Sequence, residues 1–481
     1  MIDTQAIRKK ILDLAIRGKL TEQLPEDGTA EELYQQIQAE KQAQIKAWGI
    51  KKEKALPEIA EDEKPFAIPT NWAWKRLCDL SSVSSGGTPS RGVKNYWNGA
   101  IPWVKISDIT TKYVDSTEES ITELGLNNSS AKVFPENTVL YTIFATIGNV
   151  GILKIRAATN QAIAGIAFFG EHCLDYMYYI LVGLKDNLVS KGKGMTQMNI
   201  NLTILKNTPI PLPPLAEQKR IVEKIETAFL ALDTIDELQA QYADNLAVLK
   251  SKLIDLAIRG KLTEQLPEDG TAEELYQQIQ AEKQAQIKAG KIKKEKPLPE
   301  ITEDEIPFEI PDNWAWLRWG NLSFQIQYGY NAPAKEKGDI KMVRITDIQD
   351  NKVVWNTVPF CDIEDECIDE YRLRANDILF ARTGGTVGKS FLVKKVEEDA
   401  IFAGYLIRTN FSTSLNAKYM KYFMESRLYW KQLQDGTTAT AQPNCNAKTL
   451  SKMIVPLPPL AEQNRIVERL NKILALCAET R

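Results

Sequence analysis

The chain has 481 residues, of which 43% are hydrophobic and 26% charged, and its formal net charge is −3 at pH 7. This length predicts several compact units, and no apolar run reaches the roughly 20 residues that cross a membrane. One histidine, His172, serves the whole chain, which disfavours catalysis by a histidine base, triad or metal site. The six cysteines form no C-x-x-C pair and indicate neither a zinc site nor a disulfide framework. The first residues lack the apolar core of a signal peptide, so we expect a cytoplasmic protein. Because the residues needed for most catalysis are missing, we also expect that the chain performs no chemistry itself.

A long internal repeat dominates the sequence, beginning with residues 13–47, which recur letter for letter at 255–289. The repeat continues more loosely through "LPEIAEDEKPFAIPTNWAW" at 56–74, and a second block, "PLPPLAEQ", occurs at 211–218 and again at 456–463. Such self-similarity predicts duplicated structure. The segments enclosed by the repeats, roughly 81–203 and 323–448, differ from each other in sequence.

The two variable segments are distant relatives of one another. "IPWVKISDIT" (101–110) resembles "IKMVRITDIQ" (340–349), and "NTVLYTIFATIGNVG" (137–151) resembles "NDILFARTGGTVG" (376–388). They are expected to share a fold and to differ in their surfaces. The first contains ten Lys and Arg against nine Asp and Glu, and the second seventeen against sixteen, so regional charge does not decide for or against nucleic-acid binding.

The central region predicts a long helix, because neither Gly nor Pro occurs between Pro214 and Gly260. Its apolar residues recur every 3.5 residues on average, a spacing typical of helices that pair in a coiled coil. A capping box formed by Thr271 and Glu274 predicts a further helix that ends near Ala289. The C-terminal residues repeat the first half of the central helix, and the N-terminal residues repeat its second half.

These patterns predict an α+β protein with two α/β domains formed by the variable segments, separated by long antiparallel, coiled-coil-like helices. The repeats are arranged circularly, and intramolecular pseudo-twofold symmetry is expected. A homodimeric coiled coil that uses the same apolar stripe is the alternative. The expected segments are an N-terminal helical half repeat (1–55), a first variable domain (56–214), a central helical region (215–297), a second variable domain (298–459) and a C-terminal helix (460–481).

One motif resembles a phosphate-binding loop, "ARTGGTVGKS" at 381–390. Thr383 occupies the position where such a loop needs glycine, and the strand-like "FLVKKV" follows where a helix is required. A P-loop NTPase is therefore disfavoured. The sequence also lacks a methyltransferase Asn/Asp-Pro-Pro-aromatic loop and a nuclease-like carboxylate cluster, and no metal site is predicted.

The variable segments carry turn-rich loops whose side chains suit contacts with DNA. Arginine and lysine can bond guanine, glutamine and asparagine can bond adenine, and lysine also binds phosphate. Taken alone, each candidate fits an ordinary polar loop residue better than a DNA contact, but two equivalent clusters on two copies of one fold favour binding. The first-domain candidates are Thr88, Ser90, Arg91, Lys94, Asn95, Tyr96, Lys105, Ser107, Lys191, Lys193, Thr196, Gln197 and Asn199. The second-domain candidates are Tyr328, Tyr330, Asn331, Lys335, Arg344, Thr346, Arg382, Thr383, Lys389, Thr438, Gln442 and Asn444.

Together these motifs resemble the specificity subunit of type I restriction-modification systems over essentially the whole chain. The resemblance is carried by "GGTPS" (86–90), "GAIPWVKISDI" (99–109), "MTQMNI" (195–200), both "PLPPLAEQ" blocks and the duplicated segment. The second domain departs from the family pattern, with "QYGYNAPA" in place of "GGTPS". Its DNA-contacting loop is therefore transferred less securely.

The resemblance implies a non-catalytic subunit that binds double-stranded DNA. Each variable domain, called a recognition domain below, would read one half-site, and the helices would set the gap. It also implies two methyltransferase (modification) subunits and further restriction subunits as partners. S-adenosylmethionine, ATP and magnesium would be bound by those partners, so no cofactor is expected here. The expected partner-binding residues are duplicated: Arg17, Leu20, Leu24 and Tyr34, and Arg259, Leu262, Leu266 and Tyr276.

A different class of function remains open on sequence grounds. The same helices could form a scaffold that bridges two partner proteins without reading DNA. The two hypotheses differ in what the variable loops do, because only a DNA reader needs them for site choice.

Overall fold

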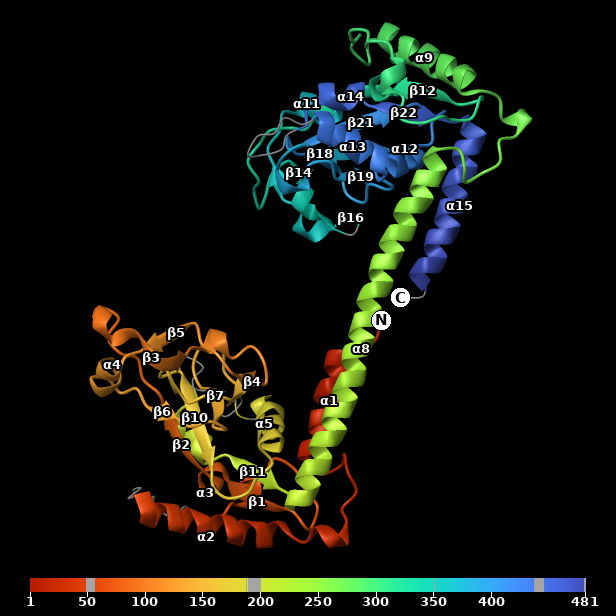
Figure 1. Ribbon diagram of the computed structural model, residues 1–481. Coiled ribbons are helices and arrows are strands. Elements are labelled where there is room, and N and C mark those ends of the chain that lie inside the picture. The colour runs from red at the N-terminus through yellow and green to blue at the C-terminus, as the bar shows by residue number, and fades with distance from the viewer. Residues whose placement is uncertain (49–56, 187, 189–199, 350, 437–444, 480–481) are drawn as a thin grey trace. The chain divides into compact units, whose positions relative to one another are not determined.

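The computed structural model describes residues 1–481 except 49–56, 187, 189–199, 350, 437–444 and 480–481 (Figure 1). The chain forms two compact units, Met1–Gln239 and Ala240–Arg481, called unit 1 and unit 2 below. Helix α8 (Leu215–Ile258) begins in unit 1 and ends in unit 2. The predicted long central helix is thereby confirmed, and it ends just before Gly260, which has a positive φ of 67°.

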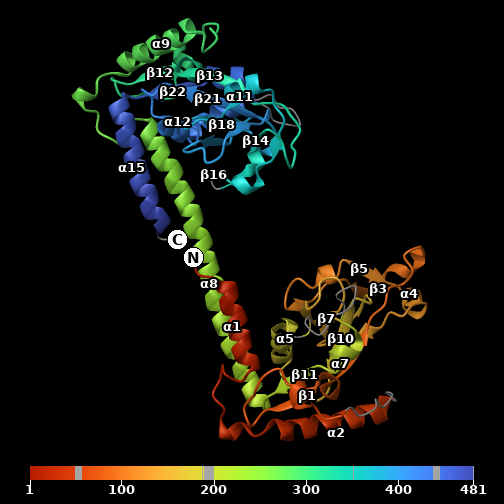
Figure 2. The same cartoon turned by 180° about the vertical axis from the view of Figure 1, so that it is seen from behind.

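In unit 1, the N-terminal helix α1 (Thr4–Ile16) lies antiparallel along the first half of α8. The backbone N–H of Ile2 donates to Gln239 (2.6 Å), and Arg8 pairs with Asp233 (2.8 Å). Both views of the molecule show the two helices side by side (Figures 1 and 2). Within unit 1, the apolar stripe of α8 is therefore partly covered by α1: Leu232 is buried, whereas Leu238 stays exposed.

In unit 2, the C-terminal helix α15 (Leu460–Glu479) takes the equivalent place beside the second half of α8 (Figures 1 and 2). Ile254 and Ile258 of α8 join Ile466 and Leu470 of α15 in one buried cluster. Each half of α8 thus has a partner helix from the same chain, as the intramolecular arrangement predicts, while Leu230, Leu238 and Leu249 of α8 stay exposed.

The duplicated segment folds identically in the two units. It forms helix α2 (Ala30–Trp48) in unit 1 and helix α9 (Ala272–Lys288) in unit 2. The predicted capping box is present at α9, because the Thr271 hydroxyl accepts from the N–H of Glu274 while the Glu274 carboxylate accepts from the N–H of Thr271. Both helices bury one apolar face, which contains Leu33 and Ile37 in α2.

A buried carboxylate anchors each duplicated segment to the helix that follows its recognition domain. Glu217 of α8 accepts hydrogen bonds from Trp72 Nε1 (2.8 Å), Thr21 Oγ1 (3.1 Å) and Gln23 Nε2 (2.9 Å). In unit 2, Glu462 of α15 accepts the same three bonds from Trp314, Thr263 and Gln265 at 2.8–2.9 Å. Because both carboxylates are fully buried, these bonds are needed to offset the lost hydration.

A second repeated contact lies beside this carboxylate. Both terminal nitrogens of Arg220 bond Asp27, each at 2.6 Å, and Arg465 bonds Asp269 in the same way at 2.6 and 2.5 Å. These hydrogen bonds lower the pKa of the Asp27 and Asp269 carboxyls below their usual range, against burial, which raises it. The Glu and Asp contacts together are called the junction below.

The recognition domain of unit 1 is built from two sheets and a short strand pair. Strands β1 (Ala73–Arg76) and β11 (Pro209–Leu212) pair antiparallel next to the junction. The larger sheet has the order β2 (Ser81–Ser85), β10 (Ile163–Phe168), β7 (Val139–Thr142), β8 (Val150–Leu153), β4 (Tyr113–Val114). The smaller has the order β5 (Glu119–Ile121), β3 (Trp97–Val104), β9 (Ala157–Thr159), β6 (Val133–Phe134). Its helices are α3 (Leu77–Leu80), α4 (Glu123–Asn127), α5 (Leu174–Gly183) and α7 (Leu202–Lys206).

The recognition domain of unit 2 repeats this plan. Strands β12 (Ala315–Arg318) and β22 (Ile454–Leu457) pair as β1 and β11 do. One sheet has the order β13 (Ser323–Tyr328), β21 (Leu406–Phe411), β18 (Ile378–Ala381), β19 (Ser390–Leu392), and another the order β17 (Phe360–Cys361), β14 (Ile340–Val343), β20 (Ala400–Phe402). Its helices are α10 (Trp319–Leu322), α11 (Asp365–Tyr371), α12 (Ala417–Phe423), α13 (Arg427–Gly436) and α14 (Ala447–Lys452).

The two domains differ mainly at the ends of their sheets. In unit 1, β4 pairs in parallel with β8 and extends the larger sheet. In unit 2, the corresponding chain forms a separate hairpin of β15 (Ile348–Gln349) and β16 (Lys352–Val353). The expected α+β architecture, with related recognition domains between long helices, is confirmed.

Candidate nucleic-acid interface

The glycine of the first loop is required by a close backbone approach in both domains. A Cβ on Gly86 would lie 2.1 Å from the carbonyl oxygen of Thr159, and one on Gly329 would lie 2.2 Å from that of Ala403. The second domain thus keeps the critical glycine of the first loop, although the sequence of this loop differs from "GGTPS". The position of the loop is shared, and only its side chains differ.

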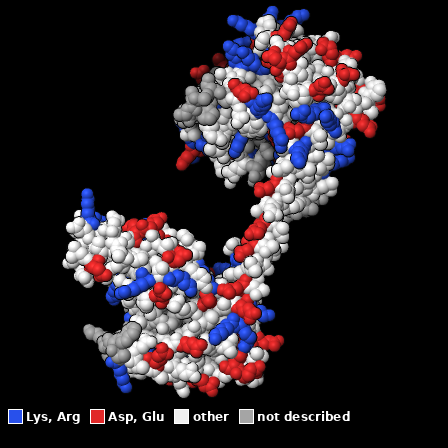
Figure 3. Space-filling model, viewed as in Figure 1, with Lys and Arg blue, Asp and Glu red and all other residues white. Residues whose placement is uncertain are grey.

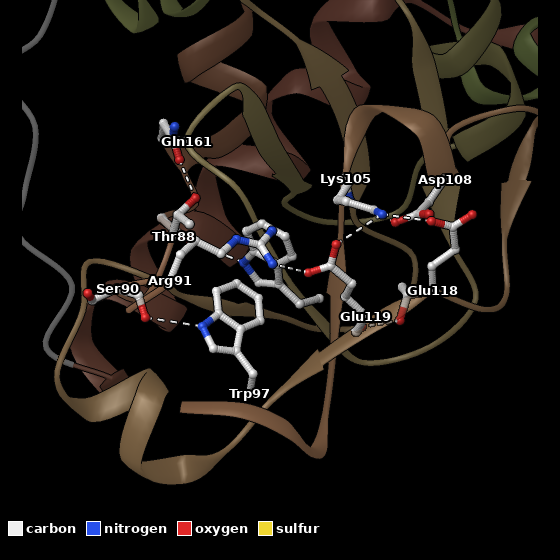
Figure 4. Close-up of polar contacts among 12 residues, drawn as sticks. Thr88, Ser90, Arg91, Trp97, Lys105, Asp108, Glu118, Glu119 and Gln161 are labelled. Carbon is white, nitrogen blue, oxygen red and sulfur yellow. Dashed lines mark hydrogen bonds and ion pairs between the residues drawn. The ribbon is translucent and has the colours of Figure 1, made fainter. Parts of the chain in front are cut away.

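Arg91 extends from the first loop of unit 1 over an aromatic surface (Figure 4). Its guanidinium carbon lies 3.8 Å from the centroid of Trp97 and 5.0 Å from that of the buried Trp103. One terminal nitrogen bonds the Glu119 carboxylate at 2.5 Å. The arginine that the sequence suggested for base contacts is therefore held by a carboxylate of its own domain.

Lys105 belongs to the same charge network. Its ammonium group bonds Glu118 at 2.7 Å and Glu119 at 3.0 Å (Figure 4). The hydrogen bond from Arg91 lowers the pKa of the Glu119 carboxyl, and Lys105 adds to this effect. The hydrogen bonds to Glu118 and Glu119 raise the pKa of Lys105. Two cations and two carboxylates are thus joined in one exposed network.

The other described candidates of unit 1 lie around this network. Thr88 donates a hydrogen bond to Gln161 at 2.5 Å, and the carbonyl of Ser90 accepts from Trp97 Nε1 at 3.1 Å. Tyr96 is half-buried, and its carbonyl accepts from the N–H of Thr122 (3.0 Å). The remaining candidates are exposed: Lys94, Asn95 and Ser107.

Arg344 and Lys335 of unit 2 are also engaged within their own domain. Arg344 forms two bonds to the buried carboxylate of Asp347, at 3.0 and 2.8 Å. Lys335 pairs with Asp362. Tyr330 packs partly into the interior, 5.2 Å from the ring of Tyr371. The remaining candidates of these two loops are exposed: Tyr328, Asn331 and Thr346.

Arg382 differs from these cations. It follows β18 directly, and its guanidinium carbon lies 4.6 Å from the ring centroid of Tyr328. Its Nε is buried, and within the described part of the chain it has no hydrogen-bond partner. Thr383 is half-buried and Lys389 is exposed. Because strand β19 begins at Ser390, no helix follows this loop, which agrees with the exclusion of a P-loop.

Eight candidates lie outside the described residues, so the structure assigns them no position: Lys191, Lys193, Thr196, Gln197, Asn199, Thr438, Gln442 and Asn444. Sequence patterns in turn missed the acidic partners Glu118 and Glu119 and the exposed aromatic Tyr405, which is 68% accessible. No motif marks a carboxylate that is brought to Arg91 only by strand pairing. Asp347, by contrast, could have been suspected, because it lies three residues after Arg344.

The expected partner-binding residues lie in and beside the junction. Leu20 and Leu24 line a groove of about 750 Å³ together with Arg220 and Lys224 of α8. Arg17 covers the ring of Phe66 at 4.7 Å, and the matched Arg259 covers that of Phe308 at 4.0 Å. Leu262, Leu266 and Tyr276 are half-buried in unit 2, and burial raises the pKa of Tyr34 to about 12.

The charges on the surface are mixed. Lys and Arg alternate with Asp and Glu over the visible face of each unit (Figure 3). Within the described ranges, no three His, Cys, Asp or Glu side chains are grouped so that they could hold a metal ion. None of the helices in that same part of the chain combines the length and apolarity needed to cross a membrane.

The family model of the type I restriction modification DNA specificity domain matches residues 69–241 and 328–480 of this chain. The chain belongs to this family. The two matches fall on the two recognition domains, so the chain carries two DNA specificity domains. This assignment confirms the interpretation of a DNA specificity subunit that is not itself the enzyme.

Curated relatives agree over nearly the full length. The chain is 27% identical to the type I restriction enzyme EcoAI specificity subunit of Escherichia coli, over 98% of this chain and 89% of the relative. It is 28% identical to the EcoEI specificity subunit of the same species, with the same coverage. A solved structure described as the basis of complex assembly and conformational transition of the type I R-M system has a TM-score of 0.57 at 19% identity, covering 86% of this chain and 93% of that one, and supports the fold.

Proposed function

We propose that this chain reads a DNA target of two half-sites, one with the loops of each recognition domain, and holds two methyltransferase subunits on its duplicated surface. The observation that carries this proposal is the combination of two identical junctions with two different loop clusters. A single fold is presented twice with the same attachment and a different reading surface. Two different half-sites and two identical partners match that combination.

The loops suit base contacts in chemical type. Arginine, lysine, asparagine and tyrosine side chains gather around the first loop of each domain, and mixed surface charge keeps the loops from acting as a uniform phosphate-binding face. A target of unequal half-sites follows because the loop clusters share almost no residues. The DNA, and with it the site of action, would be in the cytoplasm.

The partner surface is proposed on the junction and the groove beside it. Leu20 and Leu24 contribute apolar surface to the groove, and its walls carry both Lys224 and Glu223. A mixed apolar and charged groove of this kind suits a protein partner. The second copy of the segment offers the same residue types, including Leu262 and Leu266. Two methyltransferase subunits would then bind alike, and restriction subunits would join that complex.

A methylation map tests the reading function. DNA would be taken from cells that express this chain with a methyltransferase subunit of a type I system, and from cells that lack only this chain. We expect a split motif of two short half-sites, separated by a fixed unread gap, that is lost without the chain. A map that does not depend on the chain would instead favour a helical scaffold without DNA readout.

A further inference from the structure

Two backbone hydrogen bonds hold Arg382 in place. Its N–H donates to the carbonyl of Tyr405 at 3.2 Å, and its own carbonyl accepts from the N–H of Cys445 at 3.0 Å. These bonds tie the residue to two other segments of unit 2 immediately after β18. The direction in which the side chain leaves the backbone is therefore set by the fold.

The side chain of Arg382 is poorly satisfied where it lies. Guanidinium carries five N–H donors and no acceptor. The buried Nε of Arg382 has no partner in the described structure, and no carboxylate there forms an ion pair with this residue. Arg344 and Arg408 of the same domain are each paired with a buried aspartate, Asp347 and Asp377. The terminal nitrogens of Arg382 also have no hydrogen-bond or ion-pair partner among the described residues, so these donors can take an acceptor supplied from outside.

The surroundings leave room for such an acceptor. Gly384 and Gly385 follow in the loop, and a Cβ on either would meet no atom within 4 Å. Tyr405 exposes 68% of its surface nearby, and Tyr328 supplies the ring beneath the guanidinium. Among the described residues the site is thus open, aromatic and without a paired carboxylate, which suits a planar, electron-rich ligand.

Building on the proposed function, we propose that Arg382, supported by Tyr328, reads a guanine in the half-site of unit 2. Guanine presents O6 and N7 side by side in the major groove, and the arginine fork matches this pair with two parallel hydrogen bonds. The aromatic ring limits the orientations of the fork and lowers the entropy lost on binding. A phosphate would accept the same donors, but a phosphate contact would carry no sequence information.

Arg91 of unit 1 differs from Arg382 in its partners. Arg91 has a similar aromatic support, since it lies 3.8 Å from the Trp97 centroid, but one of its terminal nitrogens is already bonded to Glu119. A base contact through both terminal nitrogens of Arg91 would compete with that carboxylate. Arg382 has no such competitor among the described residues, so its donors are available in the DNA-free protein.

The first test is a methylation map of cells that express the chain and its methyltransferase with Arg382→Ala, Arg382→Lys or Arg427→Ala. We expect Arg382→Ala to relax one G·C position of one half-site, with discrimination falling about tenfold to a hundredfold. Arg382→Lys should relax the same position less, because an ammonium group can still bond guanine but lacks the planar guanidinium that forms two parallel bonds. The base sequence recognised at the other half-site should not change. Arg427, an exposed arginine paired with Asp255, is the matched control and should change no letter.

The second test uses the purified complex of chain and methyltransferase with target DNA that carries 7-deazaguanine at the relaxed position. The wild-type complex should lose affinity for this DNA, whereas the Arg382→Ala complex should bind both DNAs equally, because its contact with N7 is already gone. This comparison of two variants needs only folded complex, and Arg382→Lys serves if the alanine variant fails to assemble.

Four results would overturn the assignment. Methylation that falls at every site with unchanged letters would make Arg382 a phosphate contact. An unchanged map, or a half-site without a G·C pair, would remove its role in reading. A wild-type map with no chain-dependent split motif would instead remove the proposed function, and this assignment with it.

Discussion

The junctions of the two units are the same, whereas their loops are not. Glu217 and Glu462 hold equivalent tryptophan, threonine and glutamine side chains at nearly the same distances. Arg91 and Arg382, by contrast, come from different loops: Arg91 is bonded to a carboxylate, whereas the buried Nε of Arg382 has no partner among the described residues. The difference indicates that the junction contacts are constrained, whereas the side chains of the loops are free to vary. This is expected when one scaffold serves two unlike half-sites.

The largest expected effect comes from breaking the junction. Glu217→Ala removes the shared acceptor of three hydrogen bonds and leaves Trp72 Nε1 buried without a partner, which should cost about 3 kcal/mol of stability in unit 1. Urea unfolding followed by hydrogen exchange in each unit would measure it. Glu462→Ala is the matched variant, and a loss confined to unit 2 of similar size is expected. Clearly unequal losses would contradict equivalent junctions.

A second difference lies where each recognition domain meets its helix. Lys112 of unit 1 bonds Asp175 (2.7 Å) and Glu226 (2.6 Å), whereas in unit 2 the residue that matches Glu226, Asn471, accepts a neutral bond from Tyr422 (2.8 Å). Lys112→Met should therefore destabilise unit 1 by about 2 kcal/mol, because two carboxylates lose their shared cation.

The neutral contact provides the control for Lys112. Tyr422→Phe should cost about 1 kcal/mol in unit 2, since one neutral hydrogen bond is lost. Thermal unfolding of both variants at low and high salt would separate the two kinds of contact. Only the Lys112 loss should shrink with salt, and an equal salt response would contradict the distinction.

The carboxylate network of unit 1 predicts a smaller effect on DNA binding. Glu119→Gln removes one negative charge and weakens the hold on Arg91 and Lys105. We expect affinity for the target to rise about threefold to tenfold at low salt. The slope of the logarithm of the binding constant against the logarithm of the salt concentration should become steeper by about one. Titrations of the complex with target DNA at several salt concentrations would measure both. Weaker binding would show that Glu119 itself contacts DNA.

The aspartates of the junction predict the pH dependence. The folded pKa values of Asp27 and Asp269 lie below their ordinary values, so their stabilisation is complete above the unfolded pKa of about 3.9 and is lost as the pH falls through the folded pKa. Asp27→Asn should cost about 1 to 2 kcal/mol at pH 7, and the difference from the unmodified chain should vanish in acid. A difference that persists at pH 2 would contradict a charge-based contact.

Much of the fold was predictable because its signals are local. The absence of Gly and Pro after Pro214 predicts α8, and the half repeats at the two ends predict α1 and α15 beside it. The pairing of Arg91 with Glu119 was not predictable, since it depends on the register in which β5 meets β3. Candidate residue types were therefore identified, but their availability to DNA was not.

The most direct test of the shared attachment and independent reading is an exchange of recognition domains. Residues 315–457 would be replaced by residues 73–212, so that both junctions carry the first recognition domain. A base-resolution methylation map in cells with the methyltransferase should then show the half-site of unit 1 twice and no trace of the half-site of unit 2. A chain that assembles but still methylates the original pair of half-sites would contradict independent reading by the two domains.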